Sequence, residues 1–109
     1  MFINGQWQTD APMFSVLNPA TGEEIGQVAD ATAEDANRAI DAACAALPSW
    51  MNETAYSRSA LLFRAHQLML AQQAELAELM TKEQGKPLKA AMNEVKYAAD
   101  FLLWFAEEA

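Results

Sequence analysis

The chain of 109 residues is long enough for one domain and too short for two, so a function that needs two complete domains must draw residues from elsewhere. Its 15 acidic residues outnumber 7 basic ones, and the resulting net charge of −8 repels phosphate backbones and anionic lipids, so we expect no nucleic-acid or membrane partner. A single cysteine excludes an intramolecular disulfide, and no stretch has the pattern of a signal peptide or a membrane span. These features favour a soluble protein of the cytoplasm.

Residues 1–30 predict short strands and turns. Phe2-Ile3 and Gln6-Trp7 flank Asn4-Gly5, a pair suited to the type I′ turn of a hairpin because both central residues must reach positive φ. A strand is predicted over 14–17, and Asn18-Pro19 ends it because proline restricts the residue before it and lacks a ladder donor. After a turn, residues 24–28 predict a returning strand.

Residues 31–109 predict three or four helices. Thr32 is a candidate N-cap, and Pro48 is predicted to end the first helix and leave Trp50 in a loop. Thr54 is a candidate cap for a second helical stretch, either one kinked helix or two, which Gly85 and the following proline end. The apolar stripes predicted to face the core are Ala36, Ala39, Ile40, Ala43, Cys44 and Leu47 in the first helix, and Leu61, Leu62, Ala65, Leu68, Met69 and Gln72, then Leu76, Leu79 and Met80, in the second stretch.

The last helix is predicted from Leu88 to the end of the chain. One stripe comprises Leu88, Met92, Val95, Ala99 and Leu102, whereas the turn 101–105 is apolar on every side and therefore needs burial all round. The final residues 106–109 offer no cap, and acids at a helix C-terminus oppose its dipole. We therefore expect a piece of a larger protein whose remaining part covers residues 101–105.

Few side chains suggest chemistry. His66, the only histidine, has no cysteine or acid at helical spacing, so we expect a partly exposed structural role. Cys44 lies among alanines, which favours an inert core thiol over a nucleophile. The glycines do not form a phosphate-binding loop. Glu23-Glu24 and Glu107-Glu108 are expected to be solvated, Trp104 and Phe105 to lie in a core or interface, and Asp100 to pair with Lys96 four residues earlier.

Four phrases in this order carry a family resemblance: Phe2-Ile3-Asn4-Gly5-Gln6-Trp7, Asn18-Pro19-Ala20-Thr21-Gly22-Glu23, Glu83-Gln84-Gly85-Lys86-Pro87-Leu88 and Glu94-Val95-Lys96-Tyr97-Ala98-Ala99-Asp100-Phe101. Together they resemble the amino-terminal part of the NAD(P)-dependent aldehyde dehydrogenase superfamily, and they are most similar to the succinate-semialdehyde dehydrogenases. The resemblance covers essentially the whole chain. It implies an α/β family, of which residues 1–109 are an α+β fragment, the opening of the cofactor-binding domain.

The resemblance implies oxidation of succinate semialdehyde to succinate by a homo-oligomeric enzyme with NAD or NADP as cofactor. In the family a catalytic cysteine attacks the aldehyde, hydride passes to the nicotinamide, and a glutamate activates the hydrolytic water. These groups lie downstream of the matched stretch, and Cys44 does not match the catalytic motif. The 109-residue chain alone is therefore expected to carry no catalytic or cofactor-binding residue and to be inactive.

One site is implied by the resemblance, since several family members bind a monovalent cation between the strand before the Asn-Pro turn and an acid on the last helix. The matching positions are the Leu17 carbonyl and Asp100, with Val16 as a neighbouring candidate. Oxygen ligands suit such an ion, and the cation would offset the desolvation of a buried carboxylate. A different class of function stays open: a non-catalytic helical interaction module that binds a partner through residues 101–105.

Overall fold

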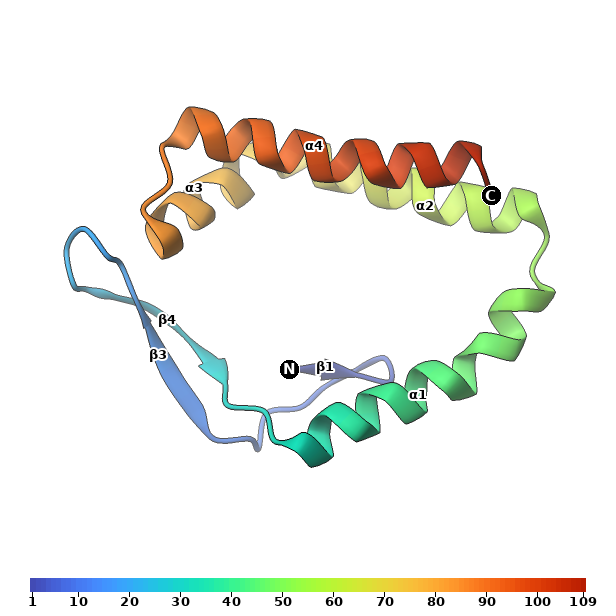
Figure 1. The fold of residues 1–109 in the computed structure, drawn as a ribbon, viewed down its shortest axis with the longest axis horizontal. Coiled ribbons are helices and arrows are strands. Elements are labelled where there is room, and N and C mark those ends of the chain that lie inside the picture. The colour runs from blue at the N-terminus through green and yellow to red at the C-terminus, as the bar shows by residue number, and fades with distance from the viewer. The chain divides into compact units, whose positions relative to one another are not determined.

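The computed structural model describes all residues, 1–109, and contains four short strands and four helices. The chain divides into two compact units: a ribbon unit, Met1–Leu17 with Glu24–Asn52, and a helical unit, Asn18–Glu23 with Glu53–Ala109. In chain order the elements are β1 (Phe2–Ile3), β2 (Gln6–Trp7), β3 (Met13–Leu17), β4 (Glu24–Ala29), α1 (Ala33–Asn52), α2 (Ala55–Ala71), α3 (Gln73–Gln84) and α4 (Leu88–Glu107) (Figure 1). Strands followed by four helices confirm the predicted α+β order.

The predicted first hairpin is present in the ribbon unit. β1 and β2 pair antiparallel, with Phe2 opposite Trp7, and the two rings meet edge to face at 5.2 Å between centroids. Asn4 and Gly5 have φ of 53° and 74°, the positive values that a type I′ turn requires at both central positions.

The second antiparallel pair joins β3 to β4. Its register runs from Met13 opposite Ala29 to Leu17 opposite Glu24, and it shifts between Val16 and Leu17. Such an irregularity bends a strand and increases its twist at that point. The strands extend one residue beyond the predicted ranges at Met13 and Ala29, and the predicted turn joins them.

The prediction that Pro48 ends the first helix was wrong. α1 continues through Pro48 to Asn52, so Trp50 is helical and not in a loop. An interior proline removes one main-chain hydrogen bond and pushes its ring against the carbonyl four residues earlier, which bends a helix without ending it when the following residues keep their own bonds. The ribbon of α1 accordingly turns toward its end (Figure 1).

The start of α1 is capped as predicted, but its apolar stripe is not buried. The hydroxyl of Thr32 accepts a hydrogen bond from the Asp35 N–H at 3.2 Å, and Asp35 Oδ2 accepts one from the Thr32 N–H at 2.8 Å. Phe2 and Ile3 lie over part of the alanine-rich surface of the helix, yet no residue of α1 is buried.

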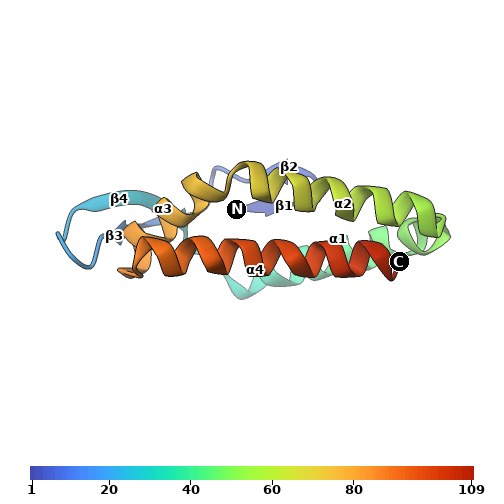
Figure 2. The ribbon, with the colours of Figure 1, turned by 90° about the horizontal axis from the view of Figure 1, so that it is seen from above.

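In the helical unit, α4 packs along α2 and then against α3 (Figures 1 and 2). The open choice between one kinked helix and two is settled as two, because Gln72 leaves the helical region at φ −100° and ψ 11°. Thr54 caps α2 by accepting a hydrogen bond from the Ser57 N–H, as predicted. Gly85 ends α3 in the left-handed conformation, and Pro87 immediately precedes α4.

The buried face of α2 differs from the prediction. Leu61 and Leu68 are 55% and 54% exposed, whereas His66 is buried. The small core consists of Ala77, Ala91 and Val95, with Met69, Leu76 and Met80 packed against it. On α4 the buried residues are Ala91, Val95, Ala99 and Ala106, so small side chains make the helix contact and the predicted Leu88 and Met92 stay outside.

None of the four helices has both the length and the apolar composition that crossing a bilayer requires.

Candidate functional site

Asp100 lies on the exposed side of α4. Its side chain is 48% exposed, and Oδ2 accepts a hydrogen bond from Lys96 Nζ at 2.7 Å, the predicted pair one turn apart. The expectation that this carboxylate is buried does not hold within the chain. An exposed pair of this kind contributes a few tenths of a kcal/mol.

The other predicted cation ligand, the carbonyl of Leu17, lies at the end of β3 beside the register shift. Val16 precedes it and pairs with Gly26. Leu17 belongs to the ribbon unit and Asp100 to the helical unit. A cation held by both therefore stays a prediction.

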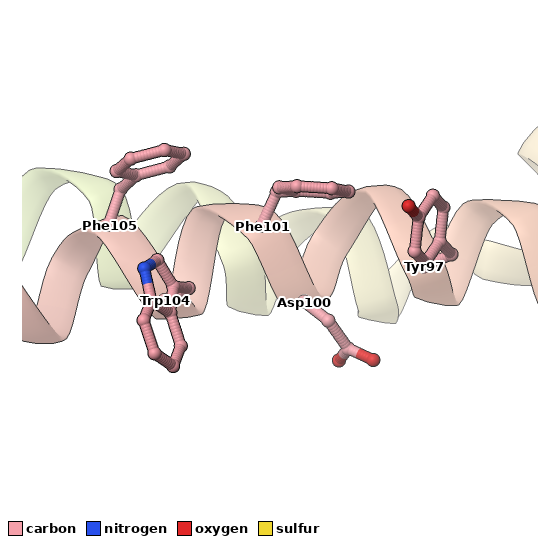
Figure 3. Close-up of a pocket in the computed structure, with 5 residues that line it drawn as sticks. All are labelled: Tyr97, Asp100, Phe101, Trp104 and Phe105. Atoms are coloured by element: carbon pink, nitrogen blue, oxygen red, sulfur yellow. The ribbon is translucent and has the colours of Figure 1, made fainter.

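Four aromatic side chains accompany Asp100 on the outer surface of α4. Tyr97, Phe101, Trp104 and Phe105 line a shallow groove with the carboxylate. Phe101, Trp104 and Phe105 are 49%, 60% and 57% exposed, so the predicted complete burial of this turn is not supplied by the chain itself. In the view of Figure 3, Phe101 and Phe105 project from the upper edge of the helix, and Asp100 and Trp104 from the lower edge. The rings thus line an open groove along α4.

His66 has a structural role, as predicted, but it is buried and not partly exposed. Its relative exposure is 9%, and Nδ1 lies 2.9 Å from the main-chain carbonyl oxygen of Ala99 on α4. The ring also stacks against Phe63 at 6.0 Å. The predicted stripe was right at Leu62 and Met69, which are partly covered, and wrong at Leu61 and Leu68, which are exposed. His66 was missed because it shares the covered face with Leu62 and Met69.

Cys44 is exposed, which contradicts the predicted core thiol. The reason is that the stripe on α1 to which it belongs has no partner in the ribbon unit beyond the first hairpin. No group of three or more His, Cys, Asp or Glu side chains comes together to hold a metal ion.

The strongest local electrostatic effect is at the start of α1. Hydrogen bonds from the Thr32 main-chain N–H, the Arg38 guanidinium and the Thr32 hydroxyl lower the pKa of Asp35 from 3.8 to about 2. The same contact raises the pKa of Arg38. On α3, a hydrogen bond from Lys82 one turn later lowers the pKa of Glu78. These are helix-stabilising pairs, and the solvated state predicted for Glu23, Glu24, Glu107 and Glu108 agrees with their exposure.

Sequence reasoning missed the polar contacts between helices. Gln73 donates from Nε2 to the Met92 carbonyl at 2.9 Å, in addition to the contact of His66 with Ala99. The available signal was spacing, since residues 62, 66, 69 and 73 recur at the interval of a helix face that packs on another helix.

Comparison with known proteins identifies the family. Residues 7–109 match the aldehyde dehydrogenase family. The chain belongs to this family. The resemblance carried by the four sequence phrases is thereby confirmed, and the chain corresponds to the amino-terminal segment of these proteins.

The relatives include semialdehyde dehydrogenases. The chain is 51% identical, over 99% of its length, to the glutarate-semialdehyde dehydrogenase of Pseudomonas putida, and 46% identical, over 97%, to an NADP(+) succinate-semialdehyde dehydrogenase of Escherichia coli. It covers 23% and 22% of these two aldehyde dehydrogenases, about a fifth of their length.

Solved structures agree on the fold. The structure of an NADP-dependent enzyme of Escherichia coli matches with a TM-score of 0.92 and 48% sequence identity. The match covers 97% of this chain and 22% of the chain of that enzyme. The succinate-semialdehyde dehydrogenase of Burkholderia pseudomallei has a TM-score of 0.91 and 46% identity, covering 98% of this chain and 23% of its own. The short strands and helices described above are therefore the fold of the corresponding part of an aldehyde dehydrogenase.

Proposed function

We propose that residues 1–109 form the amino-terminal portion of the cofactor-binding domain of a cytoplasmic, homo-oligomeric aldehyde dehydrogenase that oxidises succinate semialdehyde to succinate with NAD or NADP. The observation that carries the proposal is the match to the Burkholderia pseudomallei succinate-semialdehyde dehydrogenase, at a TM-score of 0.91 and 46% identity over 98% of this chain. The nicotinamide supplies the hydride acceptor in such enzymes.

Glutarate semialdehyde is a second candidate substrate, which the 51% identity to the Pseudomonas putida enzyme favours. The two aldehydes both end in a carboxylate and differ by one methylene. Discrimination by one methylene in an apolar pocket is worth about 10- to 200-fold in kcat/KM. The ratio of the two kcat/KM values therefore decides between the candidates.

The role we propose for this segment is scaffolding, with no residue in the chemical steps. Three features support it: Cys44 lies in an exposed alanine-rich stripe, the only histidine is bonded to a main-chain carbonyl, and the acids form local pairs or face solvent. A thiol nucleophile needs a base or a positive neighbour to form the thiolate, and the residues on either side of Cys44 are alanines. We accordingly expect the 109-residue polypeptide to lack turnover.

The test uses the natural gene product that carries residues 1–109 and, beside it, the 109-residue polypeptide. Formation of NADH or NADPH is followed with succinate semialdehyde, glutarate semialdehyde and an aldehyde without a carboxylate. We expect turnover by the gene product with a preference for the first substrate, and none by the polypeptide. Turnover by the polypeptide above a mock purification contradicts the scaffold role, and a preference for the uncharged aldehyde contradicts the substrate proposal.

We also propose that the Leu17 carbonyl and Asp100 hold a monovalent cation in the complete enzyme. The support is chemical, since both supply hard oxygen ligands, and a carboxylate covered by further protein needs a compensating charge. In the natural protein, Asp100→Asn is expected to remove the difference in thermal stability between potassium and sodium buffers, while Glu94→Gln on the same helix retains it. An unchanged difference in the Asp100 variant contradicts the assignment.

The interaction module remains the alternative, motivated by the exposed rings on α4. Light scattering of the purified polypeptide distinguishes the interaction module from the scaffold segment. A discrete soluble oligomer favours the module, whereas polydisperse aggregates favour a scaffold segment that needs the remaining enzyme.

A further inference from the structure

We propose that His66 and Gln73 form a two-point register lock that fixes the position of α4 along α2 and α3. Each residue reaches from its helix to a main-chain carbonyl of α4: His66 Nδ1 lies 2.9 Å from the oxygen of Ala99, and Gln73 Nε2 donates to the oxygen of Met92 at 2.9 Å. The proposal concerns the helical unit alone and does not depend on the substrate of the enzyme.

The spacing of the two bonds gives them a common purpose. His66 and Gln73 are seven residues apart, and Met92 and Ala99 are also seven residues apart. Seven residues are close to two turns of a helix, so the two carbonyls lie on one face of α4. The donors come from two helices, because His66 lies on α2 and Gln73 is the first residue of α3, after the break at Gln72. Gln73, the later donor in the sequence, bonds to Met92, the earlier carbonyl, and His66 bonds to Ala99. This reversed order is expected when α4 runs antiparallel to the donor helices.

On α4, the side chains that make the helix contact are small, and this is why we infer that hydrogen bonds help to fix the register. Three of the four buried residues of α4 are alanines, and the core opposite includes Ala77. Large side chains of one helix normally enter grooves of the next and resist sliding, whereas methyl groups present a shallow surface. Sliding by one residue moves each carbonyl by about 1.5 Å and turns it by about 100°, which breaks both bonds together.

A shift of α4 by a whole helical turn is opposed by side-chain volume. It brings another carbonyl to His66, but it also replaces Ala99 by Val95 or Leu103. Ala99 has 0% exposure, so the larger side chain has no space there. The hydrogen bonds therefore oppose a shift of α4 by one residue, and the small volume available at Ala99 opposes a shift by a whole turn.

The lock specifies the tautomer of His66. A carbonyl oxygen only accepts, so Nδ1 must carry the proton in the bond to Ala99. In a neutral ring Nε2 is then unprotonated. A histidine that merely fills space between Phe63 and α4 has no such requirement, so the ring nitrogens distinguish the lock from packing.

The test uses the natural protein that carries this segment, with its histidine rings labelled with ¹⁵N and the His66 resonances assigned. We expect Nδ1 of the His66 ring to carry a proton, because it bonds to the Ala99 carbonyl. A ring protonated only at Nε2 overturns the proposal. This measurement needs no substitution and so stands even if a variant fails to fold.

Variants then distinguish the effect of the hydrogen bond from the effect of side-chain volume. His66→Phe keeps the ring and removes the donor, while His66→Asn keeps an N–H donor at the position of Nδ1 and removes the ring. Gln73→Met removes the second donor, and Gln67→Met is the matched control at an exposed position on α2. Amide hydrogen exchange across residues 91–103 is the measurement.

We expect exchange to rise about fivefold in His66→Phe and in Gln73→Met, which is the factor that a typical net hydrogen bond contributes. Gln67→Met should leave it unchanged, and His66→Asn should exchange more slowly than His66→Phe. Wild-type exchange in both donor-deleting variants, or equal acceleration in Gln67→Met and Gln73→Met, overturns the lock.

Discussion

Replacing Gly85 by alanine tests two effects that coincide at the end of α3. Gly85 has φ +73° and donates its N–H to the Thr81 carbonyl at 2.9 Å. A Cβ placed there would lie 3.2 Å from Cγ of Pro19. The left-handed conformation costs an alanine about 1–2 kcal/mol, and relieving the tight contact adds about 1 kcal/mol. We expect a loss of about 2–3 kcal/mol in local stability.

Two other glycines provide matched controls. Gly22 has φ +75° but no atom within 4 Å of the position that a Cβ would take, and Gly26 lacks a positive φ and also has open space. Gly22→Ala should therefore cost about 1–2 kcal/mol from the backbone alone. Gly26→Ala should cost nothing or stabilise slightly, because glycine in a strand interior is itself unfavourable.

Amide hydrogen exchange at each substituted residue measures the three effects. A loss of about 2–3 kcal/mol corresponds to roughly 30- to 150-fold faster opening. Equal effects of Gly85→Ala and Gly22→Ala would show that the Pro19 contact contributes nothing. A Gly85→Ala protein as stable as Gly26→Ala would refute the argument from the left-handed conformation.

Three further predictions concern helices. Thr54→Ala removes the N-cap of α2 and should cost about 1 kcal/mol, seen as faster exchange of the Ser57 amide; unchanged exchange contradicts the cap. The pKa of Asp35 is lowered from 3.8 to about 2, so its stabilisation of α1 is complete well above 3.8 and is lost as pH falls through about 2; an NMR titration with its midpoint near 3.8 contradicts this. Pro48→Ala restores an N–H donor for the Cys44 carbonyl and should slow amide exchange on both sides of residue 48; faster exchange would show that the bend is stabilising.

Local signals in the sequence predicted much of the fold. Asn4-Gly5, Thr32, Thr54 and Gly85 each act on main-chain groups within a few residues, and each was found where its chemistry requires it. Pro48 was the exception. Its effect depends on whether the turns on either side are stable enough to continue, which is a property of the whole helix.

The buried faces were harder to predict because they depend on partners. Periodicity shows that Leu61 and Leu62 share a broad apolar surface, but only the position of α4 decides which is covered. The alanines of α4 carry weak periodic signal, and they form the contact while Leu88 and Met92 remain outside.

At the candidate site, the sequence predicted a local ion pair but not the contacts between helices. The pairing of Lys96 with Asp100 follows from helical spacing and was confirmed. The contact of His66 with Ala99 joins residues 33 positions apart, so no local pattern contains it. The Leu17 and Asp100 cation site came from family resemblance and remains a prediction.

The methionines around the small core give the helical unit a chemical vulnerability. Met69 and Met80 pack against Ala77, Ala91 and Val95, where their flexible thioethers fill space that alanines leave. An oxidant that converts either thioether to the sulfoxide places a polar, chiral S=O group against these apolar side chains. Oxidation of Met69 or Met80 is therefore expected to weaken the packing of the helical unit, and reduction of the sulfoxide would restore it.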